Sequence, residues 1–144
     1  MKIIPAVLIL ILLAATTYQP KIFIGTDSET VFVANAEENL PLTIEFIHSV
    51  QKTPVVEELV YRDGEFILVR TKYKSQGVGL PFDAGDGIFY RDGDWFIMDN
   101  MNRRFKNLEL RTGKGTRLKI NLGGREVELY KKFPVGTKIV VKTF

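Results

Sequence analysis

Hydrophobic and polar residues alternate along most of the chain with the period of two that is typical of half-buried β-strands. The pattern predicts about ten or eleven short strands, separated by clusters of Gly, Asp, Asn and Pro that favour turns. The predicted strands are residues 21–25, 31–34, 42–50, 55–62, 66–75, 88–91, 94–98, 108–111, 118–122, 125–130 and 138–143. Beyond residue 20 no segment has the period of an amphipathic helix. We therefore predict an all-β domain, either an antiparallel sandwich or a partly open barrel.

The first twenty residues have a different pattern. Lys2 is followed by residues 3–15, which carry no polar side chain, and Thr-Thr-Tyr extends this run to residue 18. The run is shorter than the roughly 20 apolar residues of a spanning helix and suits the apolar region of a secretory signal. We predict a hydrophobic helix in residues 1–20. It is either a cleaved signal peptide or a membrane anchor formed by residues 3–18, with a buried core element as the third interpretation. The first two place residues 21–144, a single domain, outside the cytoplasm, secreted or anchored to the membrane.

Composition excludes several classes of protein. The 144 residues are 45% hydrophobic and 26% charged, which favours one packed domain over a disordered chain. Cysteine is absent and only one histidine is present, so disulfides, cysteine nucleophiles and multi-histidine metal sites are excluded. The net charge of +3 is too small to indicate a nucleic-acid partner. No glycine pattern matches a nucleotide-binding fingerprint, and we predict no cofactor.

One candidate site follows from the expected pairing of strands. A hairpin of residues 42–50 and 55–62 places His48 opposite Glu57. A second hairpin, turning at Asp63-Gly64, places Arg70 opposite Glu57. His48, Glu57 and Arg70 would then form a row across an otherwise apolar face of the sheet.

This row has three interpretations. It is a polar patch that fixes strand register, a pocket for a small, anionic ligand held by His48 and Arg70, or the site of a small hydrolase that uses His48 and Glu57. The chain has no Gly-x-Ser-x-Gly turn, so the sequence favours binding or structure over catalysis.

A second polar region is the glycine-rich segment of residues 77–87. Asp83 and Asp86, together with Asp99, carry oxygen atoms suitable for calcium. Their spacing does not match an EF-hand loop, and aspartates in glycine-rich loops are typical of turns. The sequence therefore gives only weak support for calcium.

Three stretches resemble the motifs of the domain of unknown function 1850 family: residues 47–58, 77–82 and 95–102. Residues 99–102 depart from the more compact Asp-Met-Asn of that family. Its members are small extracytoplasmic proteins encoded beside, or fused to, membrane subunits of TAXI-type TRAP transporters, which import organic acids. The resemblance implies an accessory or binding role with the membrane or solute-binding subunits of such a transporter. It gives His48, Thr53, Pro54 and Glu57 as motif positions without known roles. A purely structural envelope protein is the alternative.

Overall fold

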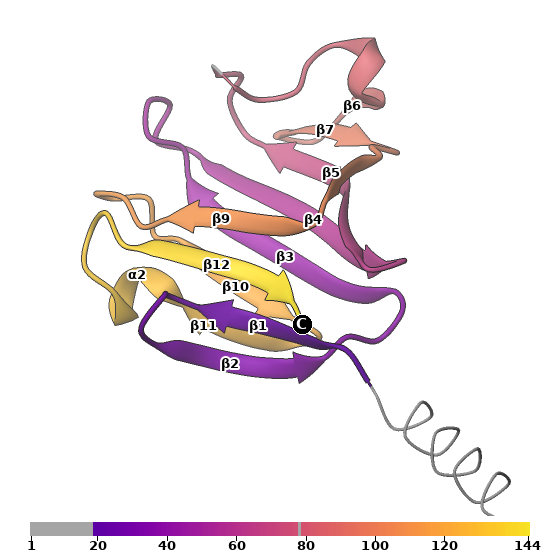
Figure 1. Cartoon of the computed structure of the whole chain (residues 1–144). Helices are drawn as coiled ribbons and strands as arrows, with labels where there is room; N and C mark the ends of the chain where they lie inside the picture. Colours follow the sequence, from indigo (N-terminus) through magenta and orange to yellow (C-terminus); the bar gives the residue numbers. More distant parts are fainter. Residues whose placement is uncertain (1–18, 78) are drawn as a thin grey trace, which may run out of the picture.

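The computed structural model describes residues 19–77 and 79–144, which form two antiparallel β-sheets (Figure 1). The sheets do not close into a barrel, so the predicted sandwich is confirmed and the barrel alternative is not. Residues 1–18 of the predicted leader, which include the whole of the predicted anchor of residues 3–18, lie outside the described residues.

The smaller sheet has four strands in the order β2-β1-β12-β9. Its strands are β1 (Lys21–Gly25), β2 (Thr30–Asn35), β9 (Asn107–Arg111) and β12 (Lys138–Thr143). The first and last strands of the domain therefore pair in the middle of this sheet, where Ile24 faces Val141.

The larger sheet has the order β11-β10-β3-β4-β5-β7-β6, and the short strand β8 pairs with β5. Its strands are β3 (Leu40–Ile47), β4 (Pro54–Arg62), β5 (Glu65–Tyr73), β6 (Ile88–Asp92), β7 (Trp95–Asp99), β8 (Arg103–Phe105), β10 (Lys119–Leu122) and β11 (Arg125–Glu128). In the described chain, helix is limited to a 3-10 turn, η1 (Ala84–Asp86), and a single α-turn, α2 (Leu129–Lys132).

Turn chemistry explains where the hairpins reverse. Asp63 and Gly64 have φ values of 52° and 79°, and Gly123 and Gly124 have 58° and 90°. Positive φ at both central residues is the requirement of a type I′ turn, which matches the twist of the strands. The predicted turn at Asp63-Gly64 is confirmed, and the two turns fix the ends of the β4–β5 and β10–β11 pairs.

The main core lies between the two sheets. Residues at alternate positions of both sheets are fully buried there, among them Ile22, Ile24, Leu42, Ile120 and Val141. Burying such a side chain contributes about 1.5–3 kcal/mol, so this layer explains why the two sheets stay together.

A second, smaller core lies beyond the four-stranded sheet. In Figure 1, β5, β7 and β6 extend past the region that β9, β12 and β1 cover. Val55, Tyr73 and Leu80 are buried together there, with Phe46 and Phe96 packed against them. Leu80, from the loop before η1, therefore covers this end of the larger sheet, where the four-stranded sheet does not reach. The inward-facing residues of β4 therefore contribute to both cores.

Candidate functional site

The predicted pairing of His48 with Glu57 is wrong. In the β3–β4 pair Ile44 faces Glu57, and the strand ends where Ile47 faces Pro54. Pro54 lies three residues from Glu57, which corresponds to about 10 Å along a strand, and His48 lies beyond that end. The register differs from the predicted one by four residues. Because four is an even number, the strand faces are unchanged, and Glu57 still lies on the mainly apolar inner face.

The imidazole of His48 is the physical reason for the early end of β3. Its Nδ1 atom accepts hydrogen bonds from the backbone N–H groups of Val50, at 3.2 Å, and Gln51, at 3.1 Å. The backbone N–H of His48 donates to the Thr53 carbonyl at 2.9 Å. A side chain that accepts bonds from the next residues offers the backbone an alternative to the ladder. His48 therefore organises the turn between β3 and β4.

The predicted pairing of Arg70 with Glu57 is also wrong, because the β4–β5 pair contains a bulge. Leu59 faces Leu68 as predicted, but the register shifts there, so that Glu58 faces Arg70 and Glu57 faces Thr71. A bulge adds one residue to one strand and reverses the faces beyond it. Arg70 therefore lies on the side of the sheet opposite to Glu57.

On the outer face Arg70 joins two carboxylates. Its Nη1 donates to Glu58 Oε2 at 3.0 Å, and its Nη2 donates to Asp99 Oδ2 at 2.9 Å. Lys72 Nζ lies 2.6 Å from the second oxygen of Glu58. The hydrogen bond from Arg70, with that from the Asn100 backbone, holds the pKa of Asp99 below its ordinary value. These residues link β4, β5 and β7, and the arginine is already engaged by carboxylates.

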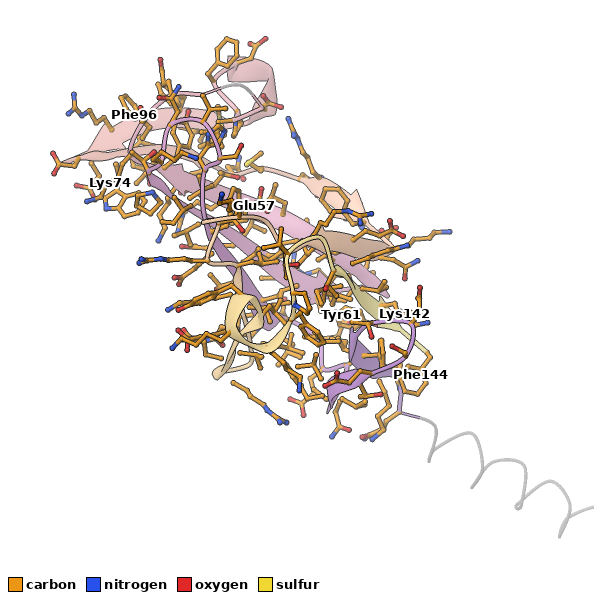
Figure 2. The ribbon with its side chains drawn as sticks, turned by 90° about the vertical axis from the view of Figure 1, so that its left-hand side faces the viewer. Glu57, Tyr61, Lys74, Phe96, Lys142 and Phe144 are labelled. Carbon is orange, nitrogen blue, oxygen red and sulfur yellow. The ribbon has the colours of Figure 1, made fainter. Side chains whose placement is uncertain are left out.

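Glu57 lies in a pocket between the two sheets, with a volume of about 290 Å³. Figure 2 shows Glu57 midway along the molecule, between Phe96 toward one end and Tyr61 toward the other. The pocket takes its walls from β3, β4, β9 and the segment before β10. The lining residues are Ile44, Phe46, Glu57, Glu109, Leu110, Arg111, Thr116 and Leu118. The pocket is therefore mainly apolar, with Glu57 as its carboxylate on the larger sheet.

Burial dominates the electrostatics of Glu57. Removal of the carboxyl from water raises the pKa of Glu57, and the positive charge of Arg103 opposes that increase. Arg103 forms an ion pair with Asp86 instead. Within residues 19–77 and 79–144, no side chain forms a hydrogen bond or ion pair with the Glu57 carboxyl. Glu57, which the sequence predicted as a site residue, is therefore a carboxyl in a mainly apolar pocket at the boundary between the two cores.

The pocket residues of β9 and of the segment before β10 were missed by the sequence reasoning. Glu109 and Arg111 come from β9 in the facing sheet, and Thr116 comes from the segment before β10, beside β3. One backbone contact fastens this wall: the Ile47 N–H donates to the Thr116 carbonyl at 2.6 Å. Period-two patterns predict partners within a sheet, but they do not predict which residues of the facing sheet lie above them.

A second pocket, of about 440 Å³, lies at the end of the molecule beside the turn of His48. Gln51, Tyr73, Gly77 and Leu80 are among its lining residues. A Cβ atom on Gly77 would lie 2.9 Å from Gln51 Cγ and 3.1 Å from His48 Cε1. The structure thus brings the segments of two of the predicted motifs, residues 47–58 and 77–82, into contact.

The three aspartates considered for calcium have separate partners. Asp83 accepts a hydrogen bond from the Gly85 N–H and caps η1. Asp86 pairs with Arg103, and Asp99 pairs with Arg70. The described part of the chain contains no group of three or more His, Asp or Glu residues arranged to hold a metal ion.

Fold and pocket together define an all-β sandwich domain with a ligand-sized pocket between its sheets. The family model described as Domain of unknown function (DUF1850) matches residues 42–129, which is more than half of the chain. The chain belongs to this family. The matched range contains every lining residue of the Glu57 pocket.

Two further comparisons found no relative: no curated protein and no solved structure matches the chain. Among the helices of residues 19–77 and 79–144, none has the length and apolar character needed to cross a membrane.

Proposed function

We propose that this protein is an extracytoplasmic accessory or binding domain that works with a TAXI-type TRAP solute transporter. The observation that carries the binding role is the pocket of about 290 Å³ with the Glu57 carboxyl inside it. A concave, mainly apolar site with few polar groups is typical of small-molecule binding. The transporter association is supported by the resemblance of the three motifs to a family whose members are encoded beside such transporters.

The proposed location depends on residues 3–18. A cleaved signal releases the domain, whereas an uncleaved anchor keeps it at the outer surface of the membrane. The mass of the chain purified from its native host distinguishes the two. A mass that lacks about the first 16 to 20 residues indicates cleavage, and a full-length chain in the membrane fraction indicates an anchor. A full-length chain in the cytosolic fraction contradicts both.

Recovery of a partner tests the accessory role. The full chain, tagged after Phe144 and expressed in its native host, is purified from solubilised membranes. We expect it to retain a membrane or solute-binding subunit of a TRAP transporter. A control carries the same first 20 residues before an unrelated β-domain and should recover none. Absence of every transporter subunit, with the tagged chain itself recovered, contradicts the association.

The hydrolase alternative loses its geometric basis. It required His48 and Glu57 on neighbouring rungs, and β3 ends before that pairing is reached. Nδ1 of His48 instead accepts two backbone hydrogen bonds within its own turn. If the binding experiment finds no ligand and the recovery experiment finds no partner, a purely structural envelope protein is the remaining alternative.

A further inference from the structure

Residues 19–77 and 79–144 place the Glu57 carboxyl between the sheets and give it no hydrogen-bond or ion-pair partner. Its neighbours along the sheet are Ile44 on β3 and Thr71 on β5. Thr71 is buried, and its hydroxyl donates to the sulfur of Met101 at 3.5 Å, so it does not serve the carboxylate. Glu57 is half-buried, and a polar group that is partly removed from water without a partner costs free energy. A ligand that supplies the missing hydrogen-bond donor would offset this free-energy cost.

The walls of the pocket define the rest of such a ligand. Ile44 and Leu118 are buried, and Phe46 and Leu110 are partly buried beside them. These side chains come from both sheets, so apolar surface lines the space from two sides. A ligand that fits a volume of about 290 Å³ has an apolar body of one ring or a short branched chain.

Glu57 is the carboxylate of the pocket that lacks a donor among the described residues, and its negative charge favours a cation. Glu109 lines the same pocket as Glu57, and Lys138 Nζ lies 2.7 Å from one of its oxygens. Arg111 donates to the Gly136 carbonyl at 3.0 Å, and Arg103 is paired with Asp86. Arg111, which lines the pocket, and Arg103, whose charge acts on Glu57, thus donate to other acceptors, whereas the carboxylate of Glu57 has no donor within the described residues.

We propose that this pocket binds a small molecule with an apolar body and a protonated amine, whose ammonium group donates hydrogen bonds to Glu57. The inference rests on the binding role proposed above and not on the transporter association. A charge-assisted hydrogen bond is stronger than a neutral one, and low polarity strengthens it further. The ammonium favours the ionised form of the carboxyl, so affinity for the amine should rise with pH as Glu57 ionises.

Three probes of nearly equal shape test this inference: benzylammonium, benzyl alcohol and benzoate. The full chain is held in a non-ionic detergent, and binding is measured by NMR titration of backbone amides at pH 7.5. We expect saturable binding of benzylammonium with shifts at Ile44, Leu110 and Leu118. The alcohol and the anion should bind at least about tenfold more weakly.

Two variants of equal charge provide the comparison. Glu57→Gln should weaken benzylammonium binding by about tenfold or more. Glu45→Gln, on the exposed outer side of β3, should change it less than about twofold. Absence of saturable benzylammonium binding overturns the inference. Equal binding of benzoate, or binding that Glu57→Gln leaves unchanged, also overturns it.

The same measurements separate this inference from the transporter association. A chain that recovers transporter subunits but binds no amine contradicts only the ligand assignment. A chain that binds benzylammonium through Glu57 but recovers no subunit contradicts only the association.

Discussion

Glu58, and not Glu57, faces Arg70 across the β4–β5 pair, and its Oε2 accepts a hydrogen bond from Arg70 Nη1 at 3.0 Å. Two carboxylates adjacent in sequence therefore have opposite environments. Glu58 lies between two cations on the outer face, whereas Glu57 lies in an apolar pocket. The bulge in β5 separates Arg70 from Glu57, so that no cation of the described residues forms an ion pair with the inner carboxyl.

The outer network predicts a loss of stability in acid. The Arg70 guanidinium lowers the pKa of Asp99 in the folded protein. The stabilisation that ionised Asp99 provides is therefore complete at pH values above the pKa of Asp99 in the unfolded chain, about 3.9. This stabilisation is lost as the pH falls through the lower pKa that Asp99 has in the folded protein. Asp99→Asn should reduce the free energy of unfolding by roughly 0.5 to 1 kcal/mol at pH 7, since these groups are partly screened by solvent. Urea unfolding at pH 7 and pH 2.5 measures this. An equal deficit at both pH values contradicts the linkage.

Glu57 should have the opposite effect on stability. Burial raises the pKa of Glu57 in the folded protein, so the cost of burying its charge is absent below the unfolded value of about 4.3. That cost is complete above the raised, folded value. Glu57→Gln should therefore be more stable than the wild type at pH 8, by a margin on the order of 1 kcal/mol that disappears near pH 4. Glu58→Gln is the matched control and should be less stable at pH 8. A loss of stability in Glu57→Gln at pH 8 would show that the carboxylate has a partner in the folded chain.

The turn of His48 predicts which substitutions the β3–β4 loop tolerates. His48→Ala removes the acceptor for two backbone N–H groups and should lower the free energy of unfolding by about 1–2 kcal/mol. His48→Asn places an oxygen where Nδ1 lies and should cost less than about half as much. Thermal unfolding of both variants measures the difference. Equal losses would contradict the assignment of His48 as a turn-forming acceptor.

The backbone at the start of β6 requires glycine at position 87. Its φ is 153°, and a Cβ atom there would collide with the Asp99 carbonyl oxygen. Gly87→Ala should therefore destabilise the protein by about 1–3 kcal/mol. Gly85→Ala, two residues earlier, meets no atom within 4 Å and is the control, expected to have little effect. A neutral Gly87→Ala in thermal unfolding would show that β6 and β7 separate more easily than their contact indicates.

Local turn chemistry and strand faces could be predicted from the sequence, but registers could not. Asp63-Gly64 determines its turn because glycine and aspartate accept positive φ, and this depends on no distant residue. Alternation placed Glu57 on the inner face. It did not specify the register, because a shift of four residues leaves every face unchanged. The bulge was also hidden, since residues 66–69 are all apolar and show no alternation.

The ionisation of the Glu57 carboxyl can be measured directly. Carboxyl-detected ¹³C NMR of the full chain, with the Glu57 signal assigned by its loss in Glu57→Gln, follows the ionisation of this one group from pH 2.5 to pH 9. We predict a midpoint above the ordinary glutamate value of about 4.3, and a decrease of that midpoint when benzylammonium is present. A midpoint at or below the ordinary value in the absence of the amine would contradict the placement of an unpartnered carboxyl in the pocket.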